Sequence, residues 1–368
     1  MEISSFKRRL EINIFMSKKV AIILVNYKDY ANRFLPDCIA SLRAQDYSGE
    51  MKIFIVDNAS SEESYNFLRA SASEAEIICN ENNDGFAKGN NDAMKLALAL
   101  NFTEIILFNM DTIVAPSAVT EMMKAAETST KIGAVQARLM LHPETTKINS
   151  LGNSTHFLGF GYCEGYHDIY KAGDNGLKEI FYPSGAAVLF KAEVLRQVGL
   201  LDETMWMYNE DQDLGWRIWL QGYSCVMTPS AVVYHKYEFS RSISKYYWMD
   251  RNRTIVMLKN YSWLTLILIF PAWLLMEIGL FIFSIQNGWF KEKLKVWAYF
   301  CSLKNWRQII KARREIQKNR KVRESQILPM ISAKIWYQEV GSNKLHLANF
   351  VFGVYWSVVK FVLRITRA

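Results

Sequence analysis

The chain has 368 residues, half of them hydrophobic, which allows one large domain with a substantial appendage. The net charge of +8 is uneven, because residues 1–240 hold 22 Lys and Arg against 30 Asp and Glu, whereas residues 241–368 hold 22 against 6. That basic second part suits nucleic acid or an anionic membrane surface, and the long apolar run at 261–285 favours the membrane. The five scattered cysteines form neither a disulfide framework nor a zinc pattern.

The first predicted feature is an N-terminal extension, residues 1–19, without the apolar stretch of a secretory signal. Strand-like apolar runs and helical patterns then alternate, at 20–25, 34–44, 53–56, 76–79, 87–99 and 105–108. This alternation predicts a mostly parallel sheet covered by helices on both faces. In such sheets ligands bind outside the carboxyl ends of the strands. Asn26, Asp57 and Asp111 lie at these ends, so we expect them to converge on one crevice.

The turn after the first strand excludes two common nucleotide-binding motifs. It reads Asn26-Tyr27-Lys28, without the glycines that a dinucleotide-binding site or a P-loop requires. Residues 82–91 instead read Asn-Asn-Asp-Gly-Phe-Ala-Lys-Gly-Asn-Asn at a predicted helix entrance. Such a segment is either an ordinary turn or a loop that surrounds a nucleotide, with backbone N–H groups and side-chain amides as hydrogen-bond donors.

The sequence becomes irregular and rich in glycine and aromatic residues from about 135 to 235. Within it we predict a strand at 182–190 and a helix at 210–221 whose first turn holds three acids. The acids could be a solvated helix start, but the neighbouring tryptophan and tyrosine side chains favour a shaped pocket. We therefore expect a second lobe that supplies the acceptor side.

Two further residues are candidate metal ligands. Asp111 follows a buried strand, where one carboxylate and the oxygens of a diphosphate suffice to hold Mg²⁺. His235 follows a strand-like run and could be a ligand, although an isolated histidine is more often structural.

Six motifs, taken in order between about residue 20 and residue 260, resemble the family 2 glycosyltransferases, which have a nucleotide-binding GT-A fold. They are Val-Asn-Tyr (25–27), Val-Asp-Asn-Ala-Ser (56–60), Asn-x-x-Gly-Phe-Ala-x-Gly-Asn-Asn (82–91), Asn-x-Asp (109–111), Ser-Gly-Ala (184–186) and Glu-Asp-x-Asp-Leu (210–214). The Gly-Phe-Ala-Lys-Gly-Asn-Asn stretch resembles the rhamnosyltransferase-type branch. The resemblance implies an α/β catalytic domain over 20–240, with a nucleotide half at 20–115 and an acceptor half at 116–240. A helical, membrane-associated part would follow at 241–368.

The resemblance also implies roles for the matching residues. Asp57 would contact the nucleotide base, with Asn26 nearby. Asp111 would bind Mg²⁺ or Mn²⁺ together with the diphosphate, and His235 would complete that metal site. The donor cleft would also be lined by Asn58, Asn83, Gly85, Asn90, Asn91 and Arg251, and the acceptor side by Ser184, Gly185 and Trp206. Many relatives have Asp where this chain has Asn109.

The expected reaction is direct displacement at the anomeric carbon. It needs a base for the acceptor hydroxyl and a cation for the departing diphosphate. The Glu210–Asp211 pair matches the position of the base, and we favour Asp211, with Glu210 and Asp213 raising its pKa by like charge. One base without a nucleophilic carboxylate implies inversion.

The expected donor is UDP-, dTDP- or GDP-linked, with rhamnose or another hexose as the sugar. The acceptor would be a saccharide or a lipid-linked saccharide in cell-surface glycan synthesis. The alternatives are a nucleotidyltransferase, which typically uses a basic, glycine-rich loop after the first strand, and a catalytically silent sugar- or lipid-binding homologue, which would have lost the acids.

The C-terminal part predicts contact with a membrane. Residues 261–285 are long enough to cross a bilayer, and Glu277 is the one charge between Lys259 and Lys291. A crossing would place the basic cluster 311–323 outside, against the positive-inside rule, and the uncharged run 345–359 is short for a return. We therefore expect a helix broken at Pro271 that docks, peripheral or monotopic, on the cytoplasmic face of the membrane. The alternative is a buried core helix.

Overall fold

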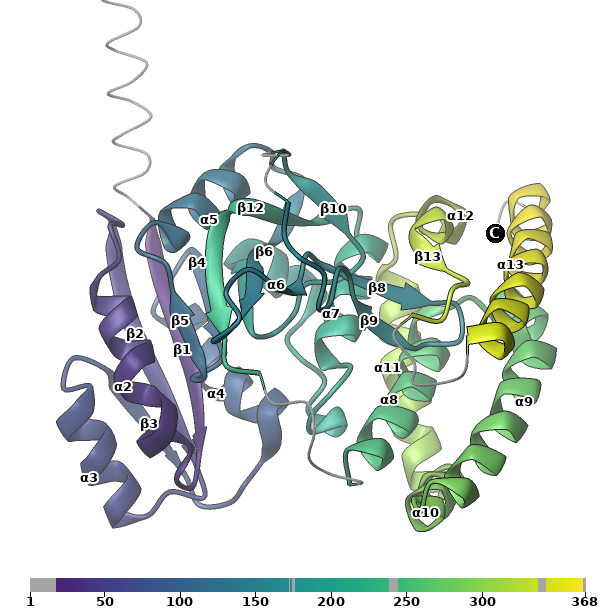
Figure 1. Cartoon of the computed structure of the whole chain (residues 1–368), viewed down its shortest axis with the longest axis horizontal. Helices are drawn as coiled ribbons and strands as arrows, with labels where there is room; N and C mark the ends of the chain where they lie inside the picture. Colours follow the sequence, from purple (N-terminus) through teal and green to yellow (C-terminus); the bar gives the residue numbers. More distant parts are fainter. Residues whose placement is uncertain (1–17, 172, 174–175, 238–243, 337–341, 367–368) are drawn as a thin grey trace, which may run out of the picture.

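The centre of the molecule is a ten-stranded mixed sheet, in a computed structural model that describes residues 18–171, 173, 176–237, 244–336 and 342–366. Its order is β10-β12-β6-β11-β4-β1-β2-β3, with β5 paired to β12 and β7 to β6 (Figure 1). The strands are β1 (Lys19–Tyr27), β2 (Glu50–Asn58), β3 (Glu76–Asn80), β4 (Glu104–Phe108), β5 (Thr112–Val114), β6 (Ile132–Leu141), β7 (Ile148–Ser150), β10 (Lys178–Ile180), β11 (Ala187–Lys191) and β12 (Ser224–His235). The predicted N-terminal extension lies outside the described residues, except for Lys18 and Lys19.

Residues 20–115, predicted as the nucleotide half, contain a parallel portion of the sheet. β4, β1, β2 and β3 run parallel, and the pairing of β1 with β2 sets Asn26 opposite Asp57. Helices cover both faces, because each apolar strand presents side chains to both sides. One face carries α2 (Tyr30–Arg43), α3 (Glu62–Ser71) and α5 (Ala118–Glu127), and the other carries α4 (Gly85–Ala99), α6 (Ala192–Val198) and α7 (Glu210–Leu220).

The acceptor half is more regular than the sequence predicted. The region expected to be irregular contains β6 and β12, which pair in parallel along most of their length. β11 lies antiparallel between β4 and β6 and so joins the two halves. The predicted strand at 182–190 begins only at Ala187, because residues 182–186 leave the sheet and line a cavity. Helix α7 matches the helix predicted at 210–221.

The C-terminal part packs on the α/β domain through a third apolar core. Its helices are α8 (Ser244–Asn260), α9 (Trp263–Gln286), α10 (Phe290–Phe300), α11 (Leu303–Asn319), α12 (Glu324–Ile327) and α13 (Ser342–Ile365). A small sheet of β8 (Asn153–His156), β9 (Gly161–Cys163) and β13 (Ile331–Ser332) also joins the two parts. The core unites Phe157 and Trp216 with Tyr261 and Trp356, so it crosses the boundary predicted at residue 240.

Helix α9 is continuous, so the predicted break at Pro271 is wrong. The proline ring removes one backbone donor, but the helix runs through it to Gln286. The predicted return segment is also longer than the sequence suggested, because α13 continues through Lys360 and Arg364 to Ile365. Both α9 and residues 345–365 are long and apolar enough to cross a membrane.

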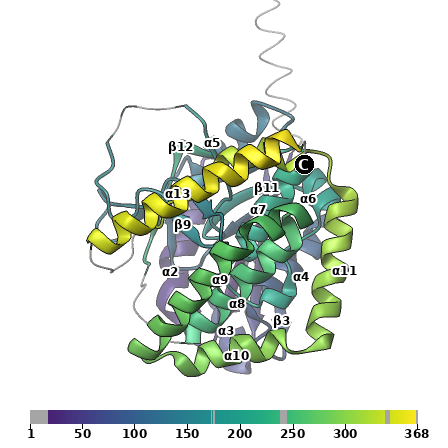
Figure 2. The ribbon, with the colours of Figure 1, turned by 90° about the vertical axis from the view of Figure 1, so that its right-hand side faces the viewer.

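Both ends of α9 are attached to the rest of the protein. At its start, the Ser262 backbone N–H donates to Glu324 at 3.1 Å. Just beyond its end, Trp289 stacks on Tyr246 of α8 with ring centroids 4.7 Å apart. Figure 2 shows α10 running below α8 and α9, and Figure 1 shows α9 standing at a distance from α8. The helix is therefore attached to the body of the protein near both ends.

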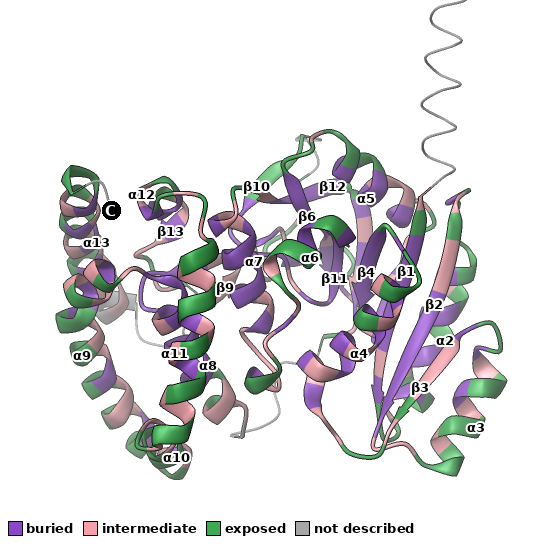
Figure 3. Ribbon diagram, turned by 180° about the vertical axis from the view of Figure 1, so that it is seen from behind, coloured by how far each residue is buried: buried purple, intermediate pink, exposed green. Residues whose placement is uncertain are grey.

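Glu277, the one charge in the apolar run, turns toward that body. It forms ion pairs with Lys293 at 2.6 Å and with Arg253, and both bases also pair with Asp250. All four side chains are buried, so two acids and two bases compensate each other between α8, α9 and α10. The opposite face of α9 exposes large apolar side chains (Figure 3).

Candidate active site

A cavity of about 1410 Å³ opens at the carboxyl ends of β1 and β4. Asn26 and Asp111 line one end of it, and Ser184, Gly185 and Asp211 line its middle. The cavity then continues between α8, α9 and α13. The crevice predicted from the strand ends is therefore present, and two of the three strand-end residues reach it.

Asp57 is the strand-end residue that does not line the cavity. Its side chain is fully buried, and Asn26 Nδ2 donates to its Oδ1 at 2.7 Å. The hydroxyls of Ser60 and Ser64 donate to its Oδ2 at 2.7 and 2.6 Å. Because protein donors already occupy both oxygens, Asp57 orients Asn26 rather than facing the cavity. The structure thus differs from the predicted base contact.

Some residues of the segment 82–91 line the cavity, and others stabilise the surrounding fold. Asn83 and Gly85 line the cavity, and Asn58 joins them by donating from Nδ2 to the Gly85 carbonyl at 3.1 Å. Asn90 and Asn91, predicted to line the cleft, do not. Asn90 Nδ2 donates to the Phe86 carbonyl at 2.9 Å, and Asn91 exchanges two hydrogen bonds with the backbone of Leu201. Their amides stabilise α4 and its contact with the acceptor half.

Asp111 and His235 form a second polar centre at the donor end. His235 Nε2 lies 3.2 Å from Asp111 Oδ1, and His235 Nδ1 lies 3.0 Å from Asn149 Oδ1. Burial by itself raises the pKa of Asp111, but hydrogen bonds from His235 and Tyr30 outweigh it and lower that pKa. The carboxylate is therefore charged at neutral pH.

These two residues fit a divalent cation with only two protein ligands. When Nδ1 of His235 donates to Asn149, Nε2 has no proton to donate to Asp111, and Nε2 and Asp111 Oδ1 are then two acceptors that a cation would satisfy. Within the described residues no three or more His, Cys, Asp or Glu side chains gather as a metal site. Mg²⁺ or Mn²⁺ held here would need further ligands from a substrate, as cations that bind diphosphates commonly do.

The acid pair at the start of α7 lies in the middle of the cavity. Asp211 Oδ1 accepts from the Gln212 N–H at 2.8 Å, and Oδ2 accepts from the Gly185 N–H at 3.3 Å. Burial raises the pKa of Asp211 to about 6, against the lowering effect of these two donors. The predicted rise is present, but burial and not Asp213 causes it, since Asp213 pairs with Arg217 at 2.9 Å.

Glu210 differs from its neighbour in its contacts. Its side chain is buried, and no donor contacts its Oε2. Burial and the charge of Asp211 raise the pKa of Glu210 well above its ordinary value. Burial and the neighbouring charge therefore favour the neutral form of Glu210, whereas Asp211 has two backbone donors that stabilise its carboxylate and is the better proton acceptor.

A strained loop presents the acid pair to the cavity. The loop has positive φ angles, between 62° and 67°, at Trp206, Tyr208 and Asn209, a backbone conformation that residues other than glycine rarely adopt. Asn252 Nδ2 lies 2.8–2.9 Å from three carbonyls of this loop. Arg251, predicted near the donor phosphates, instead donates to the Thr204 carbonyl at 2.6 Å and does not line the cavity. Helix α8 thus holds the loop.

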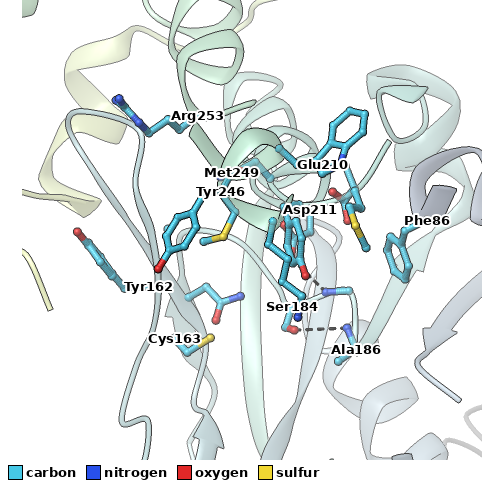
Figure 4. Close-up of a pocket in the computed structure, with 18 of the residues that line it drawn as sticks. Phe86, Tyr162, Cys163, Ser184, Ala186, Glu210, Asp211, Tyr246, Met249 and Arg253 are labelled. Atoms are coloured by element: carbon cyan, nitrogen blue, oxygen red, sulfur yellow. Dashed lines mark hydrogen bonds between the residues drawn. The ribbon is translucent and has the colours of Figure 1, made fainter. Parts of the chain in front are cut away.

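The acceptor-side residues predicted from the sequence lie around Asp211. Figure 4 shows Asp211 beside Ser184, with Phe86 on one side and Tyr246 and Met249 of α8 on the other. Gly185 bonds directly to Asp211, and Trp206 also lines the cavity. Sequence reasoning missed the supporting residues Tyr30 and Asn149, which no motif marks. The resemblance pointed to the Arg251-Asn252 segment, and Asn252 supports the loop.

The chain matches a known protein family over most of its length. A family model described as "Glycosyltransferase like family 2" matches residues 18–255. Among curated proteins, the chain is 26% identical over 207 residues to the low-salt glycan biosynthesis hexosyltransferase Agl10 of Haloferax volcanii. That alignment covers 55% of this chain and 62% of the relative, so the chain spans less than two thirds of the relative's length.

Solved structures share the fold at low sequence identity. The chain resembles GalNAc-T7, in a crystal structure with UDP, GalNAc and Mn²⁺, with a TM-score of 0.54 and 12% identity over 66% of this chain and 48% of that one. It also resembles S. aureus TarS, with a TM-score of 0.50 and 15% identity over 93% of this chain and 55% of that one. These likenesses concern the fold, a GT-A-like arrangement of sheet and helices.

Proposed function

Because this chain belongs to the glycosyltransferase-like family 2, we propose that it transfers a sugar from a nucleoside-diphosphate donor to a saccharide or lipid-linked saccharide. The proposed sugar is a hexose, with rhamnose among the candidates, and the product is part of a cell-surface glycan. The hexosyltransferase relative from glycan biosynthesis supports this class of reaction. UDP and Mn²⁺ in the GalNAc-T7 structure support a nucleoside diphosphate and a divalent cation.

The donor end of the cavity would hold the nucleotide. Asn26, Asn58, Asn83 and Gly85 line it with amide donors and backbone groups that suit a base and ribose. Asp111 and His235 would hold Mg²⁺ or Mn²⁺, which when bound supplies positive charge to the leaving diphosphate. Because Asp111 follows β4 and His235 ends β12, these two residues would determine where the cation lies in the cavity.

Asp211 would be the general base. Its Oδ2 would take the proton of the acceptor hydroxyl as that oxygen forms a bond to the anomeric carbon. The bond from this carbon to the diphosphate oxygen breaks, and its electron pair leaves with the nucleoside diphosphate. Attack from the face opposite the leaving group inverts the anomeric configuration. The Gly185 N–H, which donates to Oδ2, keeps the carboxylate oriented.

The observation that carries this proposal is an ionisable acid with a pKa of about 6 in the same cavity as the Asp111–His235 pair. Calorimetry with UDP, dTDP and GDP tests it. We expect at least one to bind in the presence of Mn²⁺, and Asp111→Asn to weaken that binding while leaving metal-free binding unchanged. Absence of binding to all three, with metal present, would contradict the proposal.

We also propose that the protein docks on the cytoplasmic face of a membrane without a stable crossing. The attachment of both ends of α9 to the body supports a helix that lies in the interface. Helix α11, which carries much of the basic cluster 311–323, packs on α8, with Arg313 donating to the Leu258 carbonyl at 2.5 Å. A crossing by α9 would have to separate these contacts.

A further inference from the structure

The cavity is larger than one small-molecule ligand requires. Ligand sites usually enclose about 300–1,000 Å³, and this cavity encloses about 1410 Å³. Its donor and central parts are lined by the polar residues described above. The remaining part is mostly apolar, lined by Met249, Leu275, Met276, Leu280, Phe283 and Phe352, together with the mutually paired Asp250 and Arg253. One cavity therefore joins the proposed base to an apolar compartment.

The apolar compartment is open to the surface along α9. Its lining residues at positions 275, 276, 279, 280 and 283 recur at the spacing of one helix face. Leu275 is 59% exposed although it lines the cavity, so it lies at the rim. Beyond the rim, α9 exposes Ile267 and Ile278, and α13 exposes Phe350 and Phe361. The compartment thus opens beside the surface proposed to face the membrane.

These features indicate what occupies the compartment. A water-soluble sugar gains nothing from an apolar lining, whereas a hydrocarbon chain gains from leaving water or from exchanging lipid for protein contacts. Lys245 lines the cavity near Tyr246 and Met249 and makes no ion pair with a residue that the structure describes. It offers positive charge in the same cavity as the apolar compartment and Asp211. The Asp250, Arg253, Glu277 and Lys293 group is already compensated.

We propose that the acceptor is a lipid-linked glycan whose hydrocarbon chain lies between α9 and α13, with its phosphate linkage near Lys245. The sugar end then reaches Asp211 while the chain remains continuous with the membrane interior. The proposal rests on the proposed function and narrows it, because the acceptor enters from the plane of the membrane rather than from solution.

Two helical glycines provide a matched test. Gly279 lines the cavity, and a Cβ atom at that position would meet nothing within 4 Å. Gly353 has the same open surroundings but lines a separate shallow groove on α13. Gly279→Phe therefore fills the apolar compartment, and Gly353→Phe adds the same ring outside it.

The probe is a polyprenyl phosphate with a diazirine in its chain, incorporated into nanodiscs with the full-length protein. We expect crosslinks on α9 around residues 275–283, competed by unlabelled polyprenyl phosphate. Gly279→Phe should weaken competition about tenfold, equivalent to about 1.4 kcal/mol, and Gly353→Phe should leave it unchanged. Equal effects of the two variants would overturn the proposal. So would equal labelling by a diazirine phospholipid, which would make the compartment a site for bulk lipid.

Calorimetric binding of nucleoside diphosphate to the same samples separates this proposal from the function on which it rests. Nucleotide binding with no protected crosslinks refutes the lipid-linked acceptor alone. Protected crosslinks without nucleotide binding refute the transferase and leave a lipid site.

Discussion

Two neighbouring carboxyl groups at the start of α7 have different surroundings. Two backbone donors contact Asp211, whereas Oε2 of Glu210 has none. A carboxylate with stable donors and a pKa of about 6 suits proton transfer near neutral pH. Glu210 is buried, and its surroundings favour the neutral form, so it suits a supporting role in the shape of the loop.

Replacement of the proposed base should separate chemistry from binding. We expect Asp211→Asn to lower kcat by roughly 10²–10⁴, the usual contribution of general-base catalysis, with nucleotide binding unchanged. Glu210→Gln, which keeps the shape of a protonated side chain, should retain most of the activity. Steady-state kinetics and calorimetry measure both. An inactive Glu210→Gln beside an active Asp211→Asn would move the base one residue.

The raised pKa of Asp211 predicts a pH dependence of the reaction. A base must be ionised, and a pKa raised from 3.8 to about 6 keeps Asp211 protonated at pH values where an ordinary aspartate is charged. We therefore expect kcat/KM to fall tenfold per pH unit below about pH 6 and to level off above it. A profile that stays flat down to pH 4.5 in a folded enzyme would exclude Asp211 as the base.

The sequence predicted positions better than directions of side chains. Asp111, His235, Gly185 and Asp211 line the cavity as expected, because strand ends and helix starts can be located from hydrophobic patterns. The directions of Asn91 and Arg251 depend on carbonyls more than 40 residues away in sequence. No local sequence pattern specifies such distant partners. The motifs therefore indicated where these residues lie in the chain but not which groups their side chains contact.

At the scale of elements, the entrance of α4 and the loop before α7 fit closely together. Gly85 has a φ of +82°, and a Cβ atom there would lie 2.5 Å from Trp206. The Trp206 carbonyl in turn accepts from the Ala87 N–H at 3.1 Å. The donor-side helix and the loop that carries the acid pair are therefore in direct contact, and Gly85 permits it.

Gly288 is a control that separates the effect of the contact between Gly85 and Trp206 from the effect of a positive φ angle. Gly288 has a φ of +79° but open space around its Cβ position. Gly288→Ala should cost about 1–2 kcal/mol in free energy of unfolding, from the left-handed backbone alone. Gly85→Ala should cost more and should also weaken nucleoside-diphosphate binding, because Trp206 must move. Urea unfolding and calorimetry test this, and equal losses with unchanged binding would refute the contact's importance.

The elements themselves were predicted unevenly. The four parallel strands and their helices were located because their apolar runs are short, continuous and well separated. β6 was missed because Gly133, Gln136 and Arg138 interrupt its apolar residues. Its partner β12 also lies about 90 residues later in the sequence. The unbroken α9 was missed because Pro271 removes only its own N–H donor, and the helix runs through it.

At the scale of the whole molecule, the docked orientation can be tested by labelling. We expect a cysteine introduced at position 318, in the basic cluster, to react with a membrane-impermeant reagent only after cell lysis. The seven basic side chains at 311–323 would each gain roughly 1 kcal/mol beside anionic lipid. The natural exposed cysteines, Cys79 and Cys301, are first replaced by serine. Labelling from outside intact cells would show a crossing and contradict docking.

The capping of α8 by α11 has a practical consequence for anyone who shortens the protein. Gln317 Nε2 donates to the Lys259 and Asn260 carbonyls, and Arg313 donates to the Tyr261 carbonyl, so the end of α8 depends on residues 50 or more positions later. A fragment cut after Asn260 to remove the apolar helices would leave the Lys259 and Asn260 carbonyls without the Gln317 donor. Since α8 holds the loop of the acid pair through Asn252, such a fragment would be expressed with its catalytic loop unsupported. Detergent-solubilised full-length protein is therefore the appropriate starting material for kinetics and crystallisation.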